Sequence, residues 1–213
     1  MTMPNSAIWW MRSLIAPCAS VIARTCRALP VVSASATWKS PSSFSCTRPV
    51  VVLATDYTVA GGSNGLIGNE KHRRAWEIAA TRGIPVVMLF DGGGHRIHEG
   101  LDARDFAGGF DIQEMQTRLS GWVPMVAAIL GPGYGQPTIA ASLCDYVVAV
   151  RGIATVGMAP PALVRMATGE DVDAEALNGP DAQAAYGTID LAVDTEDEAL
   201  EALRWYLDLL SSN

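Results

Sequence analysis

Three glycine-rich segments are the strongest candidates for chemistry in this sequence. They are Ala60–Gly68, Asp91–Gly100 and Gly131–Gly135, and each follows an apolar run. Glycine lets a backbone approach a ligand closely, and neighbouring backbone N–H groups can stabilise an oxyanion. One such segment alone is typical of an ordinary turn. Three of them at the ends of successive strands predict an active site built from main-chain donors.

Side-chain nucleophiles and metal ligands give a weaker signal. Ser63 lies in a G-x-S-x-G match, but several residues separate it from the preceding strand and no histidine follows His98. We therefore expect a loop serine, and a serine hydrolase is the least favoured activity. His95 and His98 flank an arginine with no third histidine nearby, so no metal site is predicted. His72 has basic neighbours and is expected on a solvated helix face.

The elements that must position these loops alternate along the chain. Apolar runs predict strands at 50–54, 84–90, 123–130, 145–150 and 189–193. Amphipathic stretches predict helices at 69–82, 106–120, 136–143 and 196–210, the first with Trp76, Ala79 and Ala80 on one face. Strands without polar alternation are buried on both faces, so the pattern predicts an α/β fold with a mainly parallel sheet flanked by helices. In such a sheet, the loops at the carboxyl ends of the strands form the ligand crevice.

Composition divides the 213 residues into two parts. The chain is 49% hydrophobic with a net charge of −7, but residues 1–55 contain no acidic residue and five basic ones. Residues 1–47 are interpreted as a leader, an artefact or a disordered segment; a transit peptide and a mis-set start rank equally, and a secretory signal ranks lower. The acidic remainder argues against nucleic-acid binding, and no apolar run is long enough to span a membrane. We expect a cytoplasmic protein, or a mitochondrial or plastid one if 1–47 is a transit peptide.

The second glycine-rich segment is the centre of a family resemblance. Asp91–Gly100 reads D-G-G-G-H-R-I-H-E-G and resembles the D-S-G-G-A-R-I-Q-E-G signature of biotin-dependent carboxyltransferases, the transferase half of acyl-CoA carboxylases. Residues 54–63 resemble the family's A-N-D-x-T-x-x-G-G-S, and residues 131–132 the start of its G-P-x-x-G-G loop. Thr168–Val172 resembles its T-G-E-x-V motif. The motifs occur in the family's order from about residue 48 to the C-terminus.

The resemblance implies a fold and a set of site residues. The family belongs to the crotonase superfamily, in which repeated ββα units form a spiral. The backbone N–H groups of Gly93 and Gly94 would stabilise the enolate of an acyl-CoA. Arg96 would anchor the loop, by pairing with Glu99 or Asp91, or would meet a CoA phosphate, and we favour the anchoring role. The implied substrate-binding residues are Gly61, Gly62, Ser63, Arg96, Gly133 and Gly135.

The resemblance also implies partners. The carboxyl group would come from biotin on a biotin carboxyl carrier protein, and coenzyme A would be part of the substrate. Residues 48–213 would form an incomplete domain, similar to the N-terminal half of a carboxyltransferase. A separate subunit similar to the C-terminal half would complete the site in an oligomer.

Departures from the family pattern leave other activities open. His95 and His98 replace an alanine and a glutamine, and Gln136 and Pro137 stand where the third loop has a glycine and a small residue. The histidine pair suggests a biotin-independent thioesterase or decarboxylase of the crotonase type. A non-catalytic remnant or assembly subunit is the remaining alternative.

Overall fold

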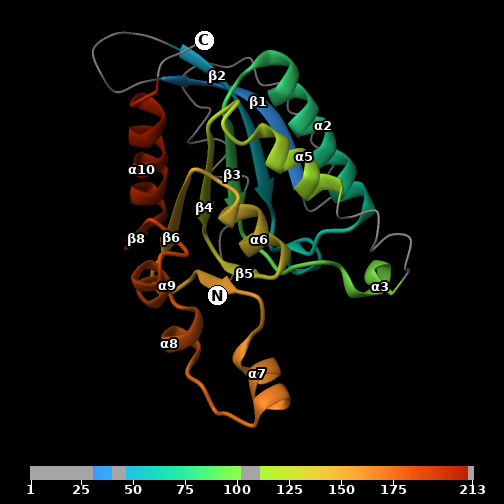
Figure 1. Ribbon diagram of the computed structural model, residues 1–213, viewed down its shortest axis with the longest axis vertical. Coiled ribbons are helices and arrows are strands. Elements are labelled where there is room, and N and C mark those ends of the chain that lie inside the picture. Colours follow the sequence, from blue (N-terminus) through green and yellow to red (C-terminus); the bar gives the residue numbers. More distant parts are fainter. Residues whose placement is uncertain (1–30, 40–46, 102–110, 211–213) are drawn as a thin grey trace.

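A six-stranded sheet forms the centre of the computed structural model (Figure 1). The structure describes residues 31–39, 47–101 and 111–210. The strand order is β1-β2-β3-β4-β6-β8, and every neighbouring pair is parallel except β1 and β2. The strands are β1 (Val31–Lys39), β2 (Thr47–Thr55), β3 (Val86–Phe90), β4 (Met125–Ile129), β6 (Tyr146–Val150) and β8 (Leu191–Val193). The predicted α/β class with a mainly parallel sheet is confirmed.

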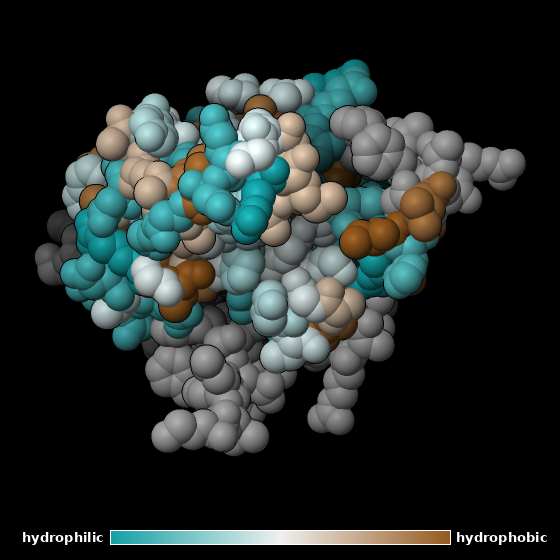
Figure 2. Space-filling view, turned by 90° about the horizontal axis from the view of Figure 1, so that it is seen from below, coloured by the Kyte–Doolittle hydropathy of each residue, from teal (hydrophilic) through white to brown (hydrophobic). Residues whose placement is uncertain are grey.

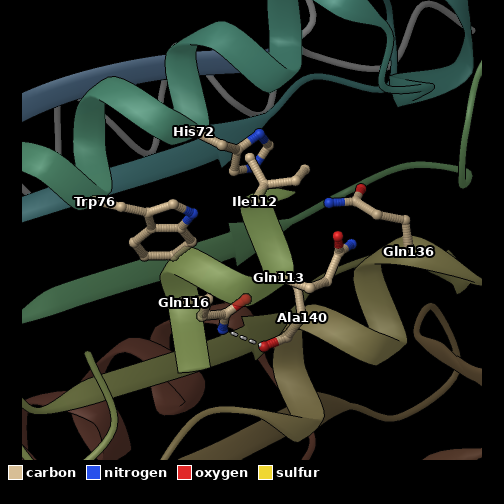
Figure 3. A pocket seen from close by; sticks show the side chains of 7 residues that line it. All are labelled: His72, Trp76, Ile112, Gln113, Gln116, Gln136 and Ala140. Carbon is tan, nitrogen blue, oxygen red and sulfur yellow. Dashed lines mark hydrogen bonds between the residues drawn. The ribbon is translucent and has the colours of Figure 1, made fainter. Parts of the chain in front are cut away.

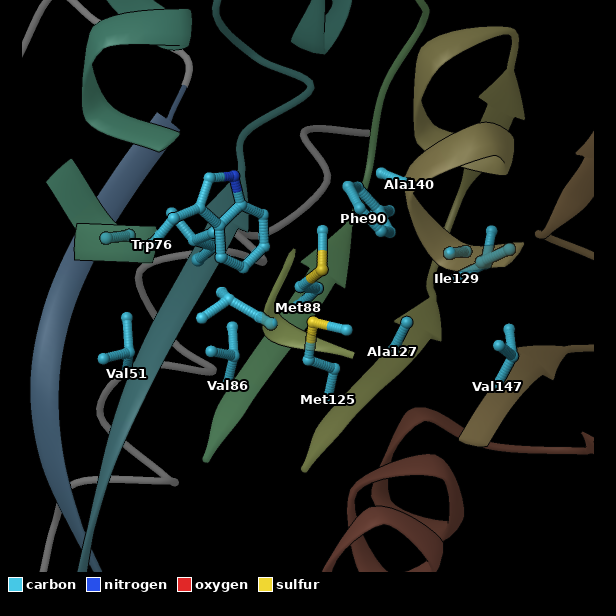
Figure 4. Close-up of a cluster of buried hydrophobic side chains, with 14 of the residues drawn as sticks. Val51, Trp76, Val86, Met88, Phe90, Met125, Ala127, Ile129, Ala140 and Val147 are labelled. Atoms are coloured by element: carbon cyan, nitrogen blue, oxygen red, sulfur yellow. The ribbon is translucent and has the colours of Figure 1, made fainter. Parts of the chain in front are cut away.

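Helices cover both faces of this sheet, and alternate strand residues face two separate cores. The first core lies beneath α2 (Leu66–Arg82), α5 (Asp111–Leu119) and α6 (Gln136–Ser142) (Figure 4). The second core lies beneath α10 (Glu196–Asp208) on the opposite face. Burial on both faces explains why the strands show no polar alternation. The first core contains the largest buried side chains, among them Trp76, Phe90, Met88 and Met125.

The strand β1 comes from the segment that the sequence analysis interprets as a leader, an artefact or disordered. It pairs antiparallel with β2 along its whole length, from Val31 opposite Thr55 to Lys39 opposite Thr47. The boundary expected near residue 48 falls at the start of β2, so it separates β1 from the strand with which β1 pairs. The nature of residues 1–47 stays a prediction, because 1–30 and 40–46 lie outside the described residues.

Smaller elements build the lower part of the molecule in Figure 1. The strands β5 (Pro132–Tyr134) and β7 (Thr155–Gly157) pair in parallel, and each follows a strand of the main sheet and precedes a helix. This gives two successive ββα units, β4–β5–α6 and β6–β7–α7. The remaining elements are η1 (Ala60–Gly62), α3 (Ile97–Gly100), α7 (Pro161–Thr168), α8 (Ala174–Asn178) and α9 (Pro180–Tyr186).

Two of these helices leave apolar side chains at the surface. Ile97 on α3 and Met166 on α7 are largely exposed, and α7 has no buried residue. Figure 2 shows this side of the molecule, where apolar residues alternate with polar ones. No helix among the described residues has the length and apolar character needed to cross a membrane.

The elements expected from the sequence all have a counterpart, with shifted ends. The helix expected at 106–120 is seen from Asp111 to Leu119, and residues 102–110 lie outside the described residues. The sequence analysis did not predict β5, β7 or α7, which are short or have no buried face.

Candidate functional site

The three glycine-rich loops meet at the carboxyl edge of the sheet, as the sequence predicts. They follow β2, β3 and β4, which are neighbours in the sheet. Gly93 N–H donates to the Gly61 carbonyl at 2.8 Å, and Gly92 N–H donates to the Pro132 carbonyl at 3.1 Å. The middle loop, 91–100, is therefore bonded to both of its neighbours. We refer to the loops 60–68, 91–100 and 131–135 as the first, middle and third loops.

Glycines between the first and middle loops allow their backbones to touch. A Cβ on Gly62 would lie 2.4 Å from the carbonyl oxygen of Asp91, and one on Gly92 would lie 2.4 Å from the Cα of Gly62. Gly62 also has a φ of 67°, which glycine adopts without strain. Gly62 is buried and allows the two loops to pack closely, and the substrate contact expected from the sequence stays a prediction.

The two glycines expected to form the oxyanion site differ in their hydrogen bonding. The N–H of Gly93 is engaged by the Gly61 carbonyl, so in this geometry it does not face a thioester oxygen. Here the donor joins two loops, and a role of Gly93 as an oxyanion donor stays a prediction. The N–H of Gly94 has no acceptor among the described residues, although its carbonyl accepts from Asn64 N–H at 2.9 Å. Gly94 is therefore a main-chain donor that the middle loop leaves available where it approaches the third loop.

A second available donor lies beside Gly94, at the start of α6. A Cβ on Gly94 would come within 2.8 Å of the Tyr134 carbonyl and 3.6 Å of the Gln136 nitrogen. Gln136 is the first residue of α6, and its N–H has no acceptor among the described residues because a helix leaves its first donors unbonded. Gly135, at the N-cap with a φ of 74°, bonds instead to the Gly157 carbonyl. Gly94 and Gln136 are thus neighbours in space, and neither main-chain N–H has an acceptor among the described residues.

Arg96 anchors the middle loop to the first, which confirms the role favoured from the sequence. Its guanidinium pairs with Glu99 at 2.9 Å and donates to the Ser63 carbonyl at 3.3 Å. Glu99 in turn accepts from the Leu66 N–H at 2.6 Å, at the start of α2. That N–H, together with Arg96, holds the pKa of Glu99 below its usual value. The pair joins the two loops at the N-terminus of a long helix, where a negative charge is favourable.

Asn64 completes this joint and is a residue that the sequence analysis missed. It is buried, its N–H and carbonyl bond to Gly94 and Arg96 of the middle loop, and its side chain donates to Asn69 at 2.6 Å. The only sequence signal for this role is the position of an asparagine inside the G-G-S-N-G segment, since asparagine commonly bonds local backbone.

The carboxylate of Asp91 lies where the middle loop begins, at the end of β3. Asp91 is half-buried at the end of β3, and burial, reinforced by the nearby Asp56, raises its pKa to about 6. Its N–H donates to the Thr55 hydroxyl at 2.6 Å, which fixes the loop against β2. A Cβ on Gly131 would lie 2.2 Å from Asp91 Oδ1, so Asp91 also sits against the start of the third loop.

Gly133 and Ser63 have structural surroundings. Gly133 belongs to β5, where a Cβ would lie 2.6 Å from the Thr155 carbonyl, so it permits the close pairing of β5 and β7. The substrate-binding role expected for Gly133 from the sequence stays a prediction. The Ser63 hydroxyl donates to the Ala60 carbonyl at 2.7 Å, which confirms a loop serine rather than an activated nucleophile. Gly61 has a φ of 63° and no atom near its Cβ position, so it stays a candidate ligand contact.

The histidines correct one expectation from the sequence. His72 is not on a solvated face: it is 2% exposed on α2, its Nδ1 lies 3.0 Å from the Gly68 carbonyl, and burial lowers its pKa to about 4. His98 is exposed on α3, and His95 is half-buried beside the first loop. Among the described residues, no group of three or more His, Cys, Asp or Glu side chains could hold a metal ion.

Comparison with known proteins gives a consistent result. The family model described as the carboxyl transferase domain matches residues 46–213. The chain is 36% identical to the propionyl-CoA carboxylase carboxyltransferase subunit of Haloferax mediterranei, over 78% of this chain and 32% of the relative. It is 34% identical to methylmalonyl-CoA decarboxylase subunit alpha of Veillonella parvula, with the same coverage of both chains. The chain thus spans about a third of the length of these curated relatives.

Solved structures share the fold over most of this chain. A transcarboxylase 12S hexamer structure with hydrolysed methylmalonyl-coenzyme A bound has a TM-score of 0.83 and 28% identity, covering 97% of this chain and 41% of that one. The hetero-dimer of MdcD and MdcE from a Pseudomonas malonate decarboxylase has a TM-score of 0.76 and 28% identity. That match covers 94% of this chain and 84% of the other, so chains of similar length occur in this fold.

Proposed function

Because the chain belongs to the carboxyl transferase domain family, we propose that it is the acyl-CoA-binding half of a biotin-dependent carboxyltransferase. Its reaction would transfer a carboxyl group from carboxybiotin to the α-carbon of a short acyl-CoA such as acetyl- or propionyl-CoA. The observation that supports this best is the pair of available N–H groups, at Gly94 and Gln136, where three glycine loops meet.

The chemical task of this chain would be to hold the charge that develops on the thioester oxygen. Removing a proton from the α-carbon converts the thioester into an enolate, whose oxygen is negatively charged. Two fixed N–H donors aimed at that oxygen stabilise the transition state without reorganising. Gly94 and Gln136 would supply these donors, which modifies the pair expected from the sequence. The joint formed by Asn64, Arg96 and Glu99 would keep the middle loop in place while the charge forms.

The other reactant would come from partners. When bound, carboxybiotin on a carrier protein supplies the carboxyl group and, after losing it, a ring nitrogen that accepts the α-proton. No protein base is then required on this chain. A separate subunit similar to the C-terminal half would hold the biotin, and the MdcD–MdcE hetero-dimer, whose matched chain is covered to 84%, is consistent with such a division. Gly61 and the rim of the first loop would meet the CoA portion.

The test uses the full chain purified with its partners. The tagged protein is isolated, co-purifying chains are identified by mass spectrometry, and the complex is assayed with acetyl- and propionyl-CoA and carboxybiotin. We expect a biotin-binding partner and a malonyl- or methylmalonyl-CoA product. A complex that contains a biotin carrier and transfers no carboxyl group to either substrate would contradict the proposal.

A second candidate is decarboxylation, favoured by the names of two groups of similar proteins, the methylmalonyl-CoA decarboxylase alpha subunits and malonate decarboxylase. The same two donors would stabilise the enolate left when carbon dioxide departs. The substitution His95→Ala tests whether a histidine takes part, because alanine is the residue of the resembled family. We expect carboxyl transfer to be preserved or improved. If the substitution abolishes a biotin-independent decarboxylase or thioesterase activity instead, the second candidate replaces the first.

A further inference from the structure

A narrow pocket lies between α2, α5 and α6, on the face of the sheet that contains the first core (Figure 3). It does not admit a water-sized sphere in this structure. The side chains of Gln113 and Gln136 extend into the space between the three helices, with their amide groups close together (Figure 3). The described lining residues are His72, Trp76, Ile112, Gln113, Gln116, Gln136 and Ala140.

Gln136 links this pocket to the proposed oxyanion site. Its backbone nitrogen lies 3.6 Å from the Cβ position of Gly94, and its side chain lines the pocket. An acyl group whose thioester oxygen is held by these N–H groups therefore has the Gln136 side chain as a near neighbour.

The lining contains apolar side chains and uncharged polar ones, and some of its polar atoms have no hydrogen-bond partner. Trp76 is 2% exposed, yet its Nε1 has no acceptor among the described residues, and Gln113 Oε1 has no donor. His72 is buried, and its lowered pKa leaves the ring neutral at physiological pH. Because the pocket admits no water-sized sphere in this structure, its width opposes the entry of a long apolar chain.

We propose that Gln136 sets the length of the acyl group, so that this chain accepts acetyl and propionyl groups and rejects linear acyl chains of six carbons. Its side chain closes the entrance to the space between α2, α5 and α6. This inference rests on the proposed function, because it assumes that the acyl group lies beside Gly94. It identifies a specificity-determining side chain at a position whose main-chain N–H has the separate role of an oxyanion donor.

The test measures binding, so it does not depend on turnover. The purified protein with its co-purified partners is titrated with acetyl-, propionyl- and hexanoyl-CoA by calorimetry, without carboxybiotin. We expect hexanoyl-CoA to bind at least about tenfold more weakly than propionyl-CoA, the lower end of the effect of a misfitting apolar group. Gln136→Gly should remove this difference, because it deletes the side chain and keeps the backbone N–H.

Two further variants separate size from general disturbance of the helix. Gln136→Met has a similar length and should retain the discrimination against hexanoyl-CoA. Ser142→Gly introduces the same glycine at the exposed end of α6, where the hydroxyl bonds only the Thr138 carbonyl, and should leave the ratio of affinities unchanged. The steric role would be overturned if Gln136→Met removed the discrimination against hexanoyl-CoA as fully as Gln136→Gly does. It would also be overturned if Ser142→Gly removed that discrimination.

The possible failures are distinguishable. If the protein binds acetyl- and propionyl-CoA but also binds hexanoyl-CoA equally well, the length limit is wrong and the proposed function stands. If no CoA ester binds to the complex, the proposed function fails and the role of Gln136 fails with it. If hexanoyl-CoA is rejected equally by the wild type and by Gln136→Gly, another residue sets the limit.

Discussion

The middle loop makes two contacts, and they are built in different ways. Toward the first loop it is tied by main-chain bonds, Gly93 N–H to the Gly61 carbonyl and Asn64 N–H to the Gly94 carbonyl, and by the Arg96–Glu99 pair. Toward the third loop it has one main-chain bond, from Gly92, and a close approach at Gly94. The main-chain N–H groups of Gly93 and Asn64 are therefore bonded at the first contact, whereas the N–H of Gly94 has no acceptor among the described residues at the second.

The difference shows how adjacent glycines with one sequence signature take different roles. Gly93 uses its N–H to hold two loops together, and Gly94 keeps its N–H available at the point of closest approach to α6. A buried donor needs an acceptor, so a donor that the protein leaves without one at a loop edge is a candidate for a ligand. The tied contact provides the rigidity that makes the available donors effective, because preorganised donors need not move when charge develops.

The largest effect is expected from a side chain at the second contact. In Gly94→Val, the new Cβ would lie 2.8 Å from the Tyr134 carbonyl, so the middle and third loops must separate. Loss of one oxyanion donor typically reduces the rate by 10² to 10³, about 3–4 kcal/mol. Steady-state carboxyl transfer by the complex measures this, and circular dichroism serves as the control for folding. A folded variant with wild-type turnover would remove Gly94 from the proposed site.

A smaller effect is expected when the tied contact is weakened. Glu99→Ala removes the acceptor of the Leu66 N–H and the partner of Arg96, and losing a helix-terminal acceptor costs about 1–2 kcal/mol. Chemical denaturation should show this loss of stability, and kcat should fall more than KM rises because the middle loop is less firmly held. Glu99→Gln keeps an acceptor oxygen and should recover most of both effects. Equal losses in the alanine and glutamine variants would mean that the charge, not the bond, matters.

The sequence predicts the sheet and its helices because they depend on repeated apolar patterns. Five parallel strands and the helices that cover them each have a counterpart in the structure. The buried face of α2 is a partial exception: it contains His72 and Ala75 with Trp76 and Ala79, whereas Ala80 is exposed. A histidine among arginines resembles a solvated residue, and only the packing of α5 and α6 over α2 reveals its burial.

The loops are predictable in position and not in hydrogen bonding. Glycine spacing places the three loops at neighbouring strand ends, and the structure brings them together there. Which N–H is used internally depends on carbonyls 30 or more residues away, such as Gly61 for Gly93. No local pattern contains that information. For the same reason, neither the hydrogen bonds of Asn64 nor the place of the Gln136 side chain in the pocket can be predicted from the sequence.

The carboxyl of Asp91 provides a pH-dependent test of the second contact. Its pKa is raised to about 6 in the folded protein and lies near 4 when unfolded, so the folded state binds the proton more tightly. Its contribution to stability is fully present below pH 4 and is lost as the pH rises through 6. The change should be roughly 1–2 kcal/mol, less than full linkage gives because Asp91 is only half-buried. Urea unfolding at pH 4.5 and pH 7.5 measures it.

The matched variant Asp91→Asn should remove this contribution, because its side chain does not titrate. The carboxylate of the first contact, Glu99, has a lowered pKa, so its own contribution is present above the ordinary pKa of a glutamate and is lost as the pH falls below it. The two contacts should therefore respond in separate pH ranges. If Asp91→Asn loses as much stability between pH 4.5 and pH 7.5 as the wild type does, the group that titrates is not Asp91.

The smallest effect is expected at Gly93, the neighbour of Gly94. A Cβ on Gly93 would lie 3.6 Å from the Gly61 carbonyl, an ordinary contact, and its backbone has no positive φ. Gly93→Ala keeps the N–H that bonds to Gly61, so carboxyl transfer should stay within about threefold of wild type. Alanine also restricts the unfolded chain, which adds up to about 0.4–1 kcal/mol of stability where the native backbone tolerates it. Turnover and thermal melting of this variant, measured beside Gly94→Val, test whether adjacent glycines have separate roles. A rate loss at Gly93→Ala comparable with that of Gly94→Val would mean that both N–H groups face the substrate, with the bond to Gly61 broken in the working complex.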